Sequence, residues 1–194
     1  MNQDPPTSAA PPSSGLNRFL QALADILETL IISAILFMVI NLVTARARVN
    51  GTSMEPTLQN GQLVLVSRLS YKLGGTPQRG DVAVFNFPRD PQQEYVKRVI
   101  GLPGDHIVIE NGQVWVNGKV LAEPYIAAAP NYKVDEVVPV EQYFVLGDNR
   151  NLSYDSHNWG MVPPEYIVGK AVLVYWPLQD FSWIAHFNLN QAAP

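Results

Sequence analysis

The chain begins with two stretches of opposite character. Residues 1–15 are rich in proline, serine and alanine and hold no aromatic side chain, so they bury too little apolar surface to offset the entropy lost on ordering. The stretch 29–45 carries no charge, and large apolar side chains would occupy every face of a helix formed by it. We therefore predict a disordered polar tail over 1–24 and a membrane-spanning anchor helix over 25–46.

The length of the apolar stretch favours an uncleaved anchor. A helix that extends back through Ile26 covers the hydrocarbon core of about 30 Å, with Asp25 and Glu28 at the interface. The alternative is a cleavable signal peptide, because the tripeptide at 45–47 (Ala-Arg-Ala) has the small-x-small form of a cleavage site. Against it, the apolar run exceeds the usual range of about 7–15 residues, and only Arg18 precedes it as a cation.

The rest of the chain, 47–194, has the pattern of strands. Short β-branched or aromatic runs bounded by turn residues predict strands at 63–66, 82–85, 95–100, 107–109, 114–116, 143–146 and 171–176. Two Asn-Gly pairs, at 111–112 and 117–118, favour the positive φ angles of tight hairpin turns. We therefore expect a three-stranded meander over 107–121 in a mainly β, antiparallel domain that follows one N-terminal transmembrane helix.

Composition then excludes several kinds of function. The net charge is -4 and no basic stripe is present, which argues against a nucleic-acid partner. The chain has no cysteine, so disulfides, thiolate metal sites and a cysteine nucleophile are all excluded. With no metal-ligand motif either, the sequence predicts neither metal nor cofactor, and any nucleophile must be an oxygen or an amine.

One strand pattern points to an unusual lysine. In the run 94–100 (EYVKRVI), period-2 alternation puts Lys97 on the face of Tyr95 and Val99 and puts Arg98 opposite, so one of two adjacent cations faces an apolar side. Burial lowers the pKa of a lysine and leaves a neutral amine that accepts a proton from a hydroxyl. Ser53 lies in a glycine- and proline-shaped loop; such a serine is usually structural, but with Lys97 it forms a candidate dyad.

Four segments together resemble a known family. They read GTSMEPTL (51–58), RGDVAVF (79–85), YVKRVIGLPGD (95–105) and GDNRNLSYDSHNWG (147–160), and they are similar, in order, to the motifs of type I signal peptidases. The single anchor and compact domain are most similar to cyanobacterial, plastid and Gram-positive members. This resemblance implies an antiparallel β fold on the trans side of the membrane and a short cytoplasmic tail, whereas the flanking arginines leave the orientation open. Plasma and thylakoid membranes both stay open.

The resemblance also implies the roles of the site residues. Ser53 is the expected nucleophile and Lys97 the general base. Ser153 is expected to hydrogen-bond the Lys97 amine and orient it, and Asp155 to support the site from behind. By the same analogy Asp148 pairs with Arg98. The oxyanion is expected to bind the Ser53 backbone N–H; where some members have a hydroxyl residue this chain has Gly51, so a second donor must come from elsewhere, such as the Thr52 hydroxyl.

The implied substrates are secretory preproteins cleaved after an Ala-x-Ala type motif. Shallow apolar pockets beside a sheet edge would accept alanine, and motif position makes Met54, Leu58, Tyr95 and Ile100 candidates for their walls. Each of the four could instead be ordinary core. The partners expected are therefore preproteins and the lipid membrane, with the enzyme a monomer.

Two departures from the family pattern are Leu152, where Asn is usual, and His157, where many members have Arg. His157 and Asp155 also permit a rival Ser53–His157–Asp155 triad, which would leave a buried Lys97 without purpose. Of the other histidines, His106 is expected at a strand start and His186 at a surface or interface.

Some readings stay open at this stage. The aromatic run 181–187 could close the core or rest on a membrane interface. A membrane-anchored β-domain that binds a partner without cleaving it is the alternative from another class. The tripeptide at 45–47 could be cut in trans by a second molecule, although we expect the domain to hold the residues after it and to prevent this in the membrane.

Overall fold

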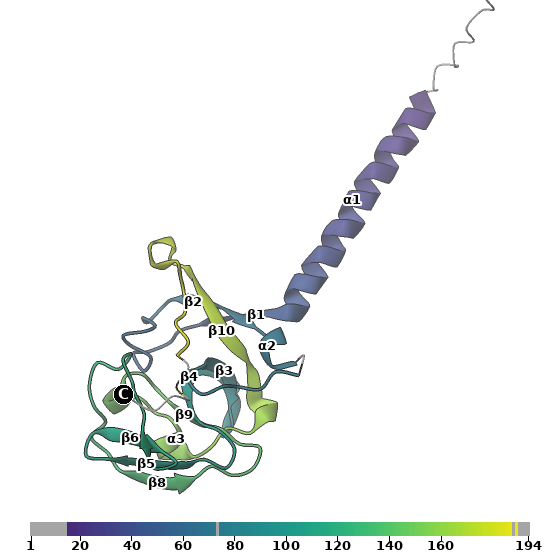
Figure 1. Cartoon of the computed structure of the whole chain (residues 1–194). Helices are drawn as coiled ribbons and strands as arrows, with labels where there is room; N and C mark the ends of the chain where they lie inside the picture. The colour runs from purple at the N-terminus through teal and green to yellow at the C-terminus, as the bar shows by residue number, and fades with distance from the viewer. Residues whose placement is uncertain (1–14, 73, 188, 190–194) are drawn as a thin grey trace, which may run out of the picture. The chain divides into compact units, whose positions relative to one another are not determined.

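The computed structural model describes residues 15–72, 74–187 and 189. The chain divides into two units, Met1–Asn41 and Leu42–Pro194. Helix α1 (Gly15–Val43; labelled in Figure 1) is the one helix within the described residues long and apolar enough to cross a membrane. None of its residues is buried.

The bounds of α1 differ from those of the predicted anchor, 25–46. The helix begins ten residues earlier, because apolar side chains recur at helical spacing from Leu16 onward, and it ends at Val43, where the chain enters a strand. The part of the predicted tail at 15–24 is therefore helical. The rest of that tail, 1–14, lies outside the described residues.

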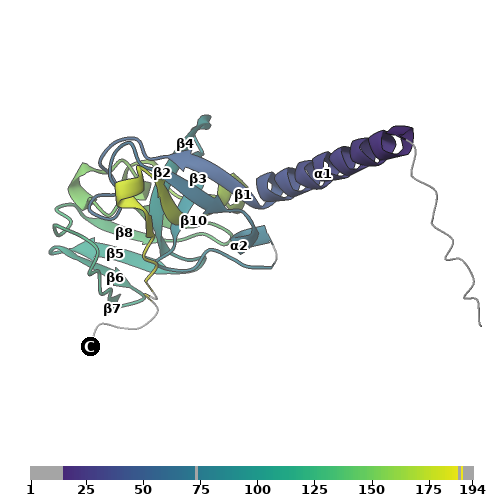
Figure 2. The same ribbon diagram turned by 90° about the horizontal axis from the view of Figure 1, so that it is seen from above.

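The second unit is built from two antiparallel sheets (Figures 1 and 2). The larger sheet has the order β1-β2-β10-β3-β4-β9, with β11 paired to β10. Its strands are β1 (Thr44–Arg48), β2 (Leu63–Ser67), β3 (Val82–Phe87), β4 (Asp90–Gly101), β9 (Phe144–Leu146), β10 (Ile167–Trp176) and β11 (Ser182–Trp183).

The smaller sheet has the order β7-β6-β5-β8. Its strands are β5 (His106–Glu110), β6 (Gln113–Val116), β7 (Lys119–Val120) and β8 (Val134–Val137). Short helices fill the connections: α2 (Leu69–Lys72), α3 (Ser156–Trp159), and the 3-10 turns η1 (Arg150–Leu152), η2 (Pro164–Tyr166) and η3 (Leu178–Asp180).

These elements confirm the predicted fold class. Each predicted run lies within an observed strand or overlaps one, and the meander over 107–121 is β5-β6-β7. Its two turns carry the expected left-handed pairs, with φ of 51° and 77° at Asn111 and Gly112 and of 52° and 76° at Asn117 and Gly118. An asparagine–glycine pair accepts these angles with little strain, so each hairpin closes within two residues.

Strand β4 contributes to all three groups of buried apolar side chains. Val96 packs in one group with β2 and β10, Val99 in a second with Phe85 and Trp159, and Ile100 in a third with the smaller sheet. The second half of β4, from Val96 to Gly101, is buried where these groups meet, so a polar side chain there is removed from water on either face.

Candidate active site

Strand β4 places two neighbouring cations in the interior. Lys97 shares a face with Tyr95 and Val99, and Arg98 points to the other face, as the alternation predicted. Both are buried, with 5% of Lys97 and none of Arg98 exposed. A buried charge is costly unless it is paired, so what each cation contacts decides its state.

Lys97 contacts the serine of the β1–β2 connection. Its Nζ lies in a hydrogen bond with Oγ of Ser53, at 2.6 Å. The serine loop is held by the connection after β9: the Asn149 backbone N–H donates to the Ser53 carbonyl at 3.0 Å, and the Asn149 side-chain amide donates to the Thr52 carbonyl at 3.2 Å. Two connections that are far apart in sequence thus fix the hydroxyl against the amine.

Burial sets the charge of this lysine. Removal from water lowers the pKa of Lys97 to about 8, against the opposing attraction of the Asp155 and Asp148 carboxylates, which favour the charged form. The direction agrees with the sequence expectation. An amine with this pKa is neutral in about a tenth of molecules one pH unit below it, far more than an ordinary lysine, and then accepts a proton from a hydroxyl in contact with it.

Gly147 allows the close approach of the two connections. A Cβ at this position would collide with the Ser53 carbonyl and with the Ser153 side chain, so only glycine fits. The Ser153 hydroxyl is buried against this glycine and, among the described residues, makes no hydrogen bond. The predicted bond from Ser153 to Lys97 is therefore not formed. A sequence motif places the residue but does not determine the side-chain rotamer that aims its hydroxyl.

Asp155 supports the site through the backbone. Its carboxylate accepts a hydrogen bond from the Gly147 N–H at 2.9 Å and caps the first turn of α3. One of its oxygens lies 2.6 Å from Nδ1 of His157, whose ring stacks on Tyr132 with centroids 3.8 Å apart. In the described part of the chain no hydrogen bond joins His157 to Ser53, so the Ser53–His157–Asp155 triad is not assembled.

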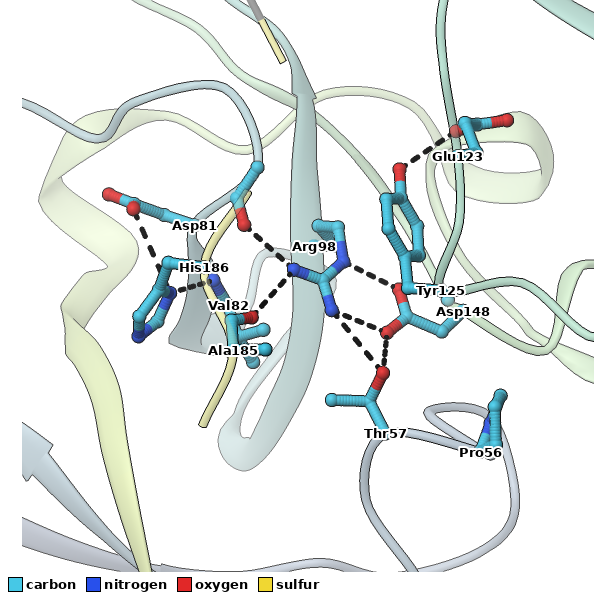
Figure 3. Close-up of polar contacts among 12 residues, drawn as sticks. Pro56, Thr57, Asp81, Val82, Arg98, Glu123, Tyr125, Asp148, Ala185 and His186 are labelled. Atoms are coloured by element: carbon cyan, nitrogen blue, oxygen red, sulfur yellow. Dashed lines mark hydrogen bonds and ion pairs between the residues drawn. The ribbon is translucent and has the colours of Figure 1, made fainter. Parts of the chain in front are cut away.

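Arg98 forms the hub of a buried network (Figure 3). Its Nε and one terminal nitrogen donate to the two Asp148 oxygens at 2.8 and 2.6 Å, and the predicted ion pair is confirmed. Its other terminal nitrogen donates to the carbonyls of Gly80 and Ala185. Thr57 donates its hydroxyl to Asp148 at 2.6 Å. Arg98 is thus fully paired. Through the bond from Thr57 to Asp148, the network also holds the loop that carries Ser53.

Sequence reasoning did not single out Thr57 or Asn149. Both lie inside the motif segments, at 51–58 and 147–160, and both carry a side-chain hydrogen-bonding group next to a glycine- or proline-shaped turn. That pattern is the signal that could have identified them. The local pattern does not identify the residue that each side chain bonds, because contacts between segments about 90 residues apart are set by the sheet and not by local spacing.

A cleft of about 520 Å³ opens over Ser53 and Lys97. Met54 and Tyr95 are in its lining, as predicted. Leu58 and Ile100 are not; both are fully buried in core groups, and the prediction that they form its wall is corrected. Ile100 lies on the face of β4 opposite Lys97, and Leu58 closes a turn onto Met54. The remaining lining residues are Arg48, Val49, Asn50, Gly51, Thr52, Gln93, Glu94, Val96, Leu152 and Tyr154.

The floor of the cleft has an open strand edge. β4 pairs with β3 along most of its length, but β9 joins its other edge only from Arg98 onward. The segment 93–97, which lines the cleft, therefore keeps one edge free of the described strands. Leu152, the departure from the family pattern, also lines the cleft. Because 70% of its surface is exposed, the leucine side chain fits there without displacing a core residue.

The remaining expectations from the sequence concern two histidines and the aromatic run 181–187. His106 begins β5, is half exposed and lies 2.6 Å from Asp135, as expected for a polar strand start. His186 is partly buried, with 22% of its side chain exposed: its Nε2 is shielded from solvent, and its Nδ1 lies 3.8 Å from the Asp81 carboxylate. In the aromatic run 181–187, Phe181 and Trp183 are exposed while Ile184 packs in the core. The run therefore closes the core only in its second half.

Comparisons with known proteins show which family the chain belongs to. A model of the family described as signal peptidase, peptidase S26, matches residues 23–176. The chain is 46% identical over 159 residues to a probable signal peptidase I-2 of Synechocystis sp., which covers 78% of this chain and 72% of the relative. It is 38% identical over 183 residues to a signal peptidase I of Leptolyngbya laminosa, covering 90% of each.

A signal peptidase I from Enterococcus faecalis, known from its crystal structure, is 34% identical, with a TM-score of 0.44 over 49% of this chain and 96% of that one. The family model and the two cyanobacterial-type relatives each extend over far more than half of the chain, and the matched range includes Ser53, Lys97 and the connection after β9. The chain belongs to the signal peptidase family, peptidase S26.

Proposed function

We propose that the protein is a membrane-anchored serine endopeptidase that removes N-terminal signal peptides from secretory preproteins. The observation that carries the proposal is the 2.6 Å contact between Ser53 Oγ and Lys97 Nζ, beneath a cleft, with the pKa of the lysine lowered to about 8. A hydroxyl next to a neutral amine is the arrangement that nucleophilic catalysis by a serine requires.

The proposed mechanism uses the lysine twice. Ser53 Oγ attacks the scissile carbonyl and its proton passes to Lys97 Nζ, which then gives it to the leaving amine as the acyl-enzyme forms. Lys97 next takes a proton from the water that attacks the ester, and it returns this proton to Ser53 Oγ as the acid product leaves. Within the described residues the Ser53 N–H has no hydrogen-bond partner, so it is free to bind the oxyanion. The exposed Thr52 hydroxyl is the candidate second donor, since Gly51 offers none.

The open edge and the lining of the cleft support the proposed substrate. An extended peptide adds to the open edge of β4 at 93–97, so that its backbone pairs there and alternate side chains face the wall. Met54 and Tyr95 narrow the cleft near Ser53. Small residues at the first and third positions before the scissile bond fit such a wall, which corresponds to cleavage after Ala-x-Ala.

The membrane arrangement belongs to the same proposal. Helix α1 anchors a monomer as a single span in the plasma or thylakoid membrane, with the short N-terminal tail in the cytoplasm and the catalytic unit on the trans side. Substrates of this class carry their own apolar segment in the same bilayer, so the anchor confines enzyme and cleavage site to one surface and raises their effective concentration.

The test compares the detergent-solubilised full chain with two variants on a preprotein. Ser53→Ala and Lys97→Ala should each abolish cleavage, and the double variant should be no worse than either single one, because nucleophile and base act as a unit. His157→Ala is the matched control and should retain most activity. An active Lys97→Ala protein beside a folded but inactive His157→Ala protein would contradict the dyad, and binding of preprotein without cleavage by the wild type would support a non-catalytic domain.

A further inference from the structure

A second cavity, of about 350 Å³, lies beside α2, which packs on β10 (Figure 2). Two cations and one carboxylate are among the side chains that line it, together with tyrosine and threonine hydroxyls: Arg68, Lys72, Glu165, Tyr71, Tyr143 and Thr76. The cavity has no role in the mechanism proposed above.

Both cations in this cavity lack a partner in the described part of the chain. The Arg68 side chain makes no hydrogen bond or ion pair there, and its Nε is shielded from solvent. Lys72 is exposed and equally unpaired. The nearby Asp81 carboxylate is already taken, at 3.0 Å by the Tyr71 hydroxyl and at 2.6 Å by Lys170. A buried guanidinium donor without an acceptor costs free energy, which a bound anion recovers.

The position of Arg68 in the chain suggests which anion is near. Its backbone N–H donates to the carbonyl of Val43 at 3.0 Å, and Val43 is the last residue of α1. The next residue, Thr44, is the cross-strand partner of Ser67. The cavity therefore begins one residue from the point where the chain leaves the helix, whatever direction the helix takes from there.

We propose that this cavity binds the phosphate of an anionic phospholipid in the trans leaflet. The proposal rests on the membrane anchoring proposed above, because a span that ends at Val43 puts Arg68 at the level of the phosphates. Arg68 and Lys72 donate to the phosphate oxygens, and Glu165 limits the net charge of the cavity. A zwitterionic headgroup brings its own ammonium to the same two cations and is disfavoured. The bound lipid fixes the base of the catalytic unit to the bilayer surface.

The experiment offers the full chain, in mild detergent, an equimolar mixture of phosphatidylglycerol and phosphatidylcholine and measures the retained lipids by native mass spectrometry. The wild type should prefer phosphatidylglycerol, and removal of one cation should reduce that preference about fivefold. The variants are Arg68→Gln and Lys72→Gln. Lys119→Gln, an exposed cation on β7, is the matched control and should behave as the wild type, whereas Glu165→Gln should increase the preference.

Several outcomes would overturn the proposal. One is an equal preference in the wild type and in Lys72→Gln, a surface substitution that leaves folding intact even if Arg68→Gln does not. Another is loss of the lipid on addition of millimolar inorganic phosphate, which would assign the cavity to a soluble anion. Carbonate extraction of membranes tests the anchor separately: release of the wild type would contradict the anchor, while a firmly held protein without lipid preference would contradict the cavity alone. Ser53→Ala should retain the lipid normally.

Discussion

Lys97 and Arg98 are adjacent on β4 and both buried, but they differ in their hydrogen-bond partners. Arg98 has both oxygens of Asp148 and three further acceptors around it. Lys97 has one hydroxyl, and the nearest carboxylates act on it without a hydrogen bond. An unpaired buried ammonium loses its proton easily, whereas a paired guanidinium keeps its charge.

The state of Lys97 predicts the pH dependence of cleavage. Because only the neutral amine accepts the Ser53 proton, the initial rate on a preprotein should increase with pH and reach half its maximum near pH 8, where the pKa of Lys97 lies. The rate is measured from about pH 6 to about pH 10, with protein integrity checked at each pH. A midpoint near the ordinary lysine value, about 10.4, would contradict the burial argument.

Thr57 is a positioning residue, since it contacts Asp148 and not the reacting atoms. Thr57→Val removes that hydrogen bond and releases one side of the serine loop, so kcat should fall about tenfold to a hundredfold. KM and the pH midpoint should change little, because the cleft and the burial of Lys97 are kept. Thr57→Ser retains the hydroxyl and is the control. A shifted pH midpoint in Thr57→Val would show instead that the threonine acts on the lysine.

At the scale of single residues, the sequence predicted which residues lie at the site better than it predicted their contacts. Lys97 could be identified because alternation must put one of two adjacent cations on an apolar face, and Arg98–Asp148 followed by analogy. Whether Ser153 bonds the Lys97 amine could not be decided from the motif, because the rotamer of the serine side chain determines it. Leu58 and Ile100 were misplaced for a related reason: an apolar residue in a motif fits a cleft wall and a core equally well.

At the scale of elements, β1 links the apolar helix to the site. All five of its residues, Thr44–Arg48, pair in register with β2, and Ala47 is buried. The β1–β2 connection, which carries Ser53, begins directly after this strand. Pairing of β1 therefore positions the start of that connection and also occupies the backbone of 45–47, the tripeptide that resembles a cleavage site.

This pairing predicts when self-cleavage occurs. A peptidase binds its substrate as an extended strand with free backbone groups, and in β1 those groups on one edge are held by β2. The chain should stay intact in the membrane, and a new N-terminus at Arg48 should appear only in concentrated detergent samples left to age, where β1 opens and molecules meet. Ser53→Ala should not show it. N-terminal sequencing decides, and equal loss in both proteins would contradict self-cleavage in trans.

The strands that could be predicted are those with a buried face. β2 and β5 are short apolar, mostly β-branched runs bounded by turn residues and were found from that pattern, and the Asn-Gly turns fixed the meander. β1 and β8 were missed. Their residues (TARAR and VDEV) carry charges and little apolar surface, and they are strands because an adjacent strand offers its edge. Such strands depend on tertiary pairing, which a local pattern does not contain.

At the scale of the whole catalytic unit, the segment after β11 joins parts that are distant in sequence. The Ile184 N–H donates to Val172 on β10, and the Ala185 carbonyl accepts from Arg98 on β4. Ile184 packs with the core of the larger sheet, whereas Phe187 packs with that of the smaller one. Between them, His186 accepts a hydrogen bond from the Val82 N–H at 3.4 Å (Figure 3). By these contacts with both sheets, the segment 184–187 contributes to the stability of the whole unit.

His186 gives this unit a predictable sensitivity to acid. Burial and the nearby Lys170 lower the pKa of His186 to about 4, although Asp81 opposes them. In the unfolded chain the same group titrates at about 6.5, so below that pH the unfolded state gains a proton that the folded state does not bind. The stability present above pH 6.5 is therefore lost progressively as the pH falls toward 4, by on the order of 1–3 kcal/mol.

The measurement is the melting temperature of the full chain in detergent between about pH 7 and about pH 4.5. His186→Asn keeps an acceptor for the Val82 N–H and has no titrating group, so its melting temperature should fall less steeply over this range than that of the wild type. His106→Asn, at an exposed strand start, removes a histidine that does not contact Lys170 or Asp81 and should leave the wild-type slope unchanged. If all three proteins lose stability in parallel, carboxylate protonation and not His186 governs the acid response.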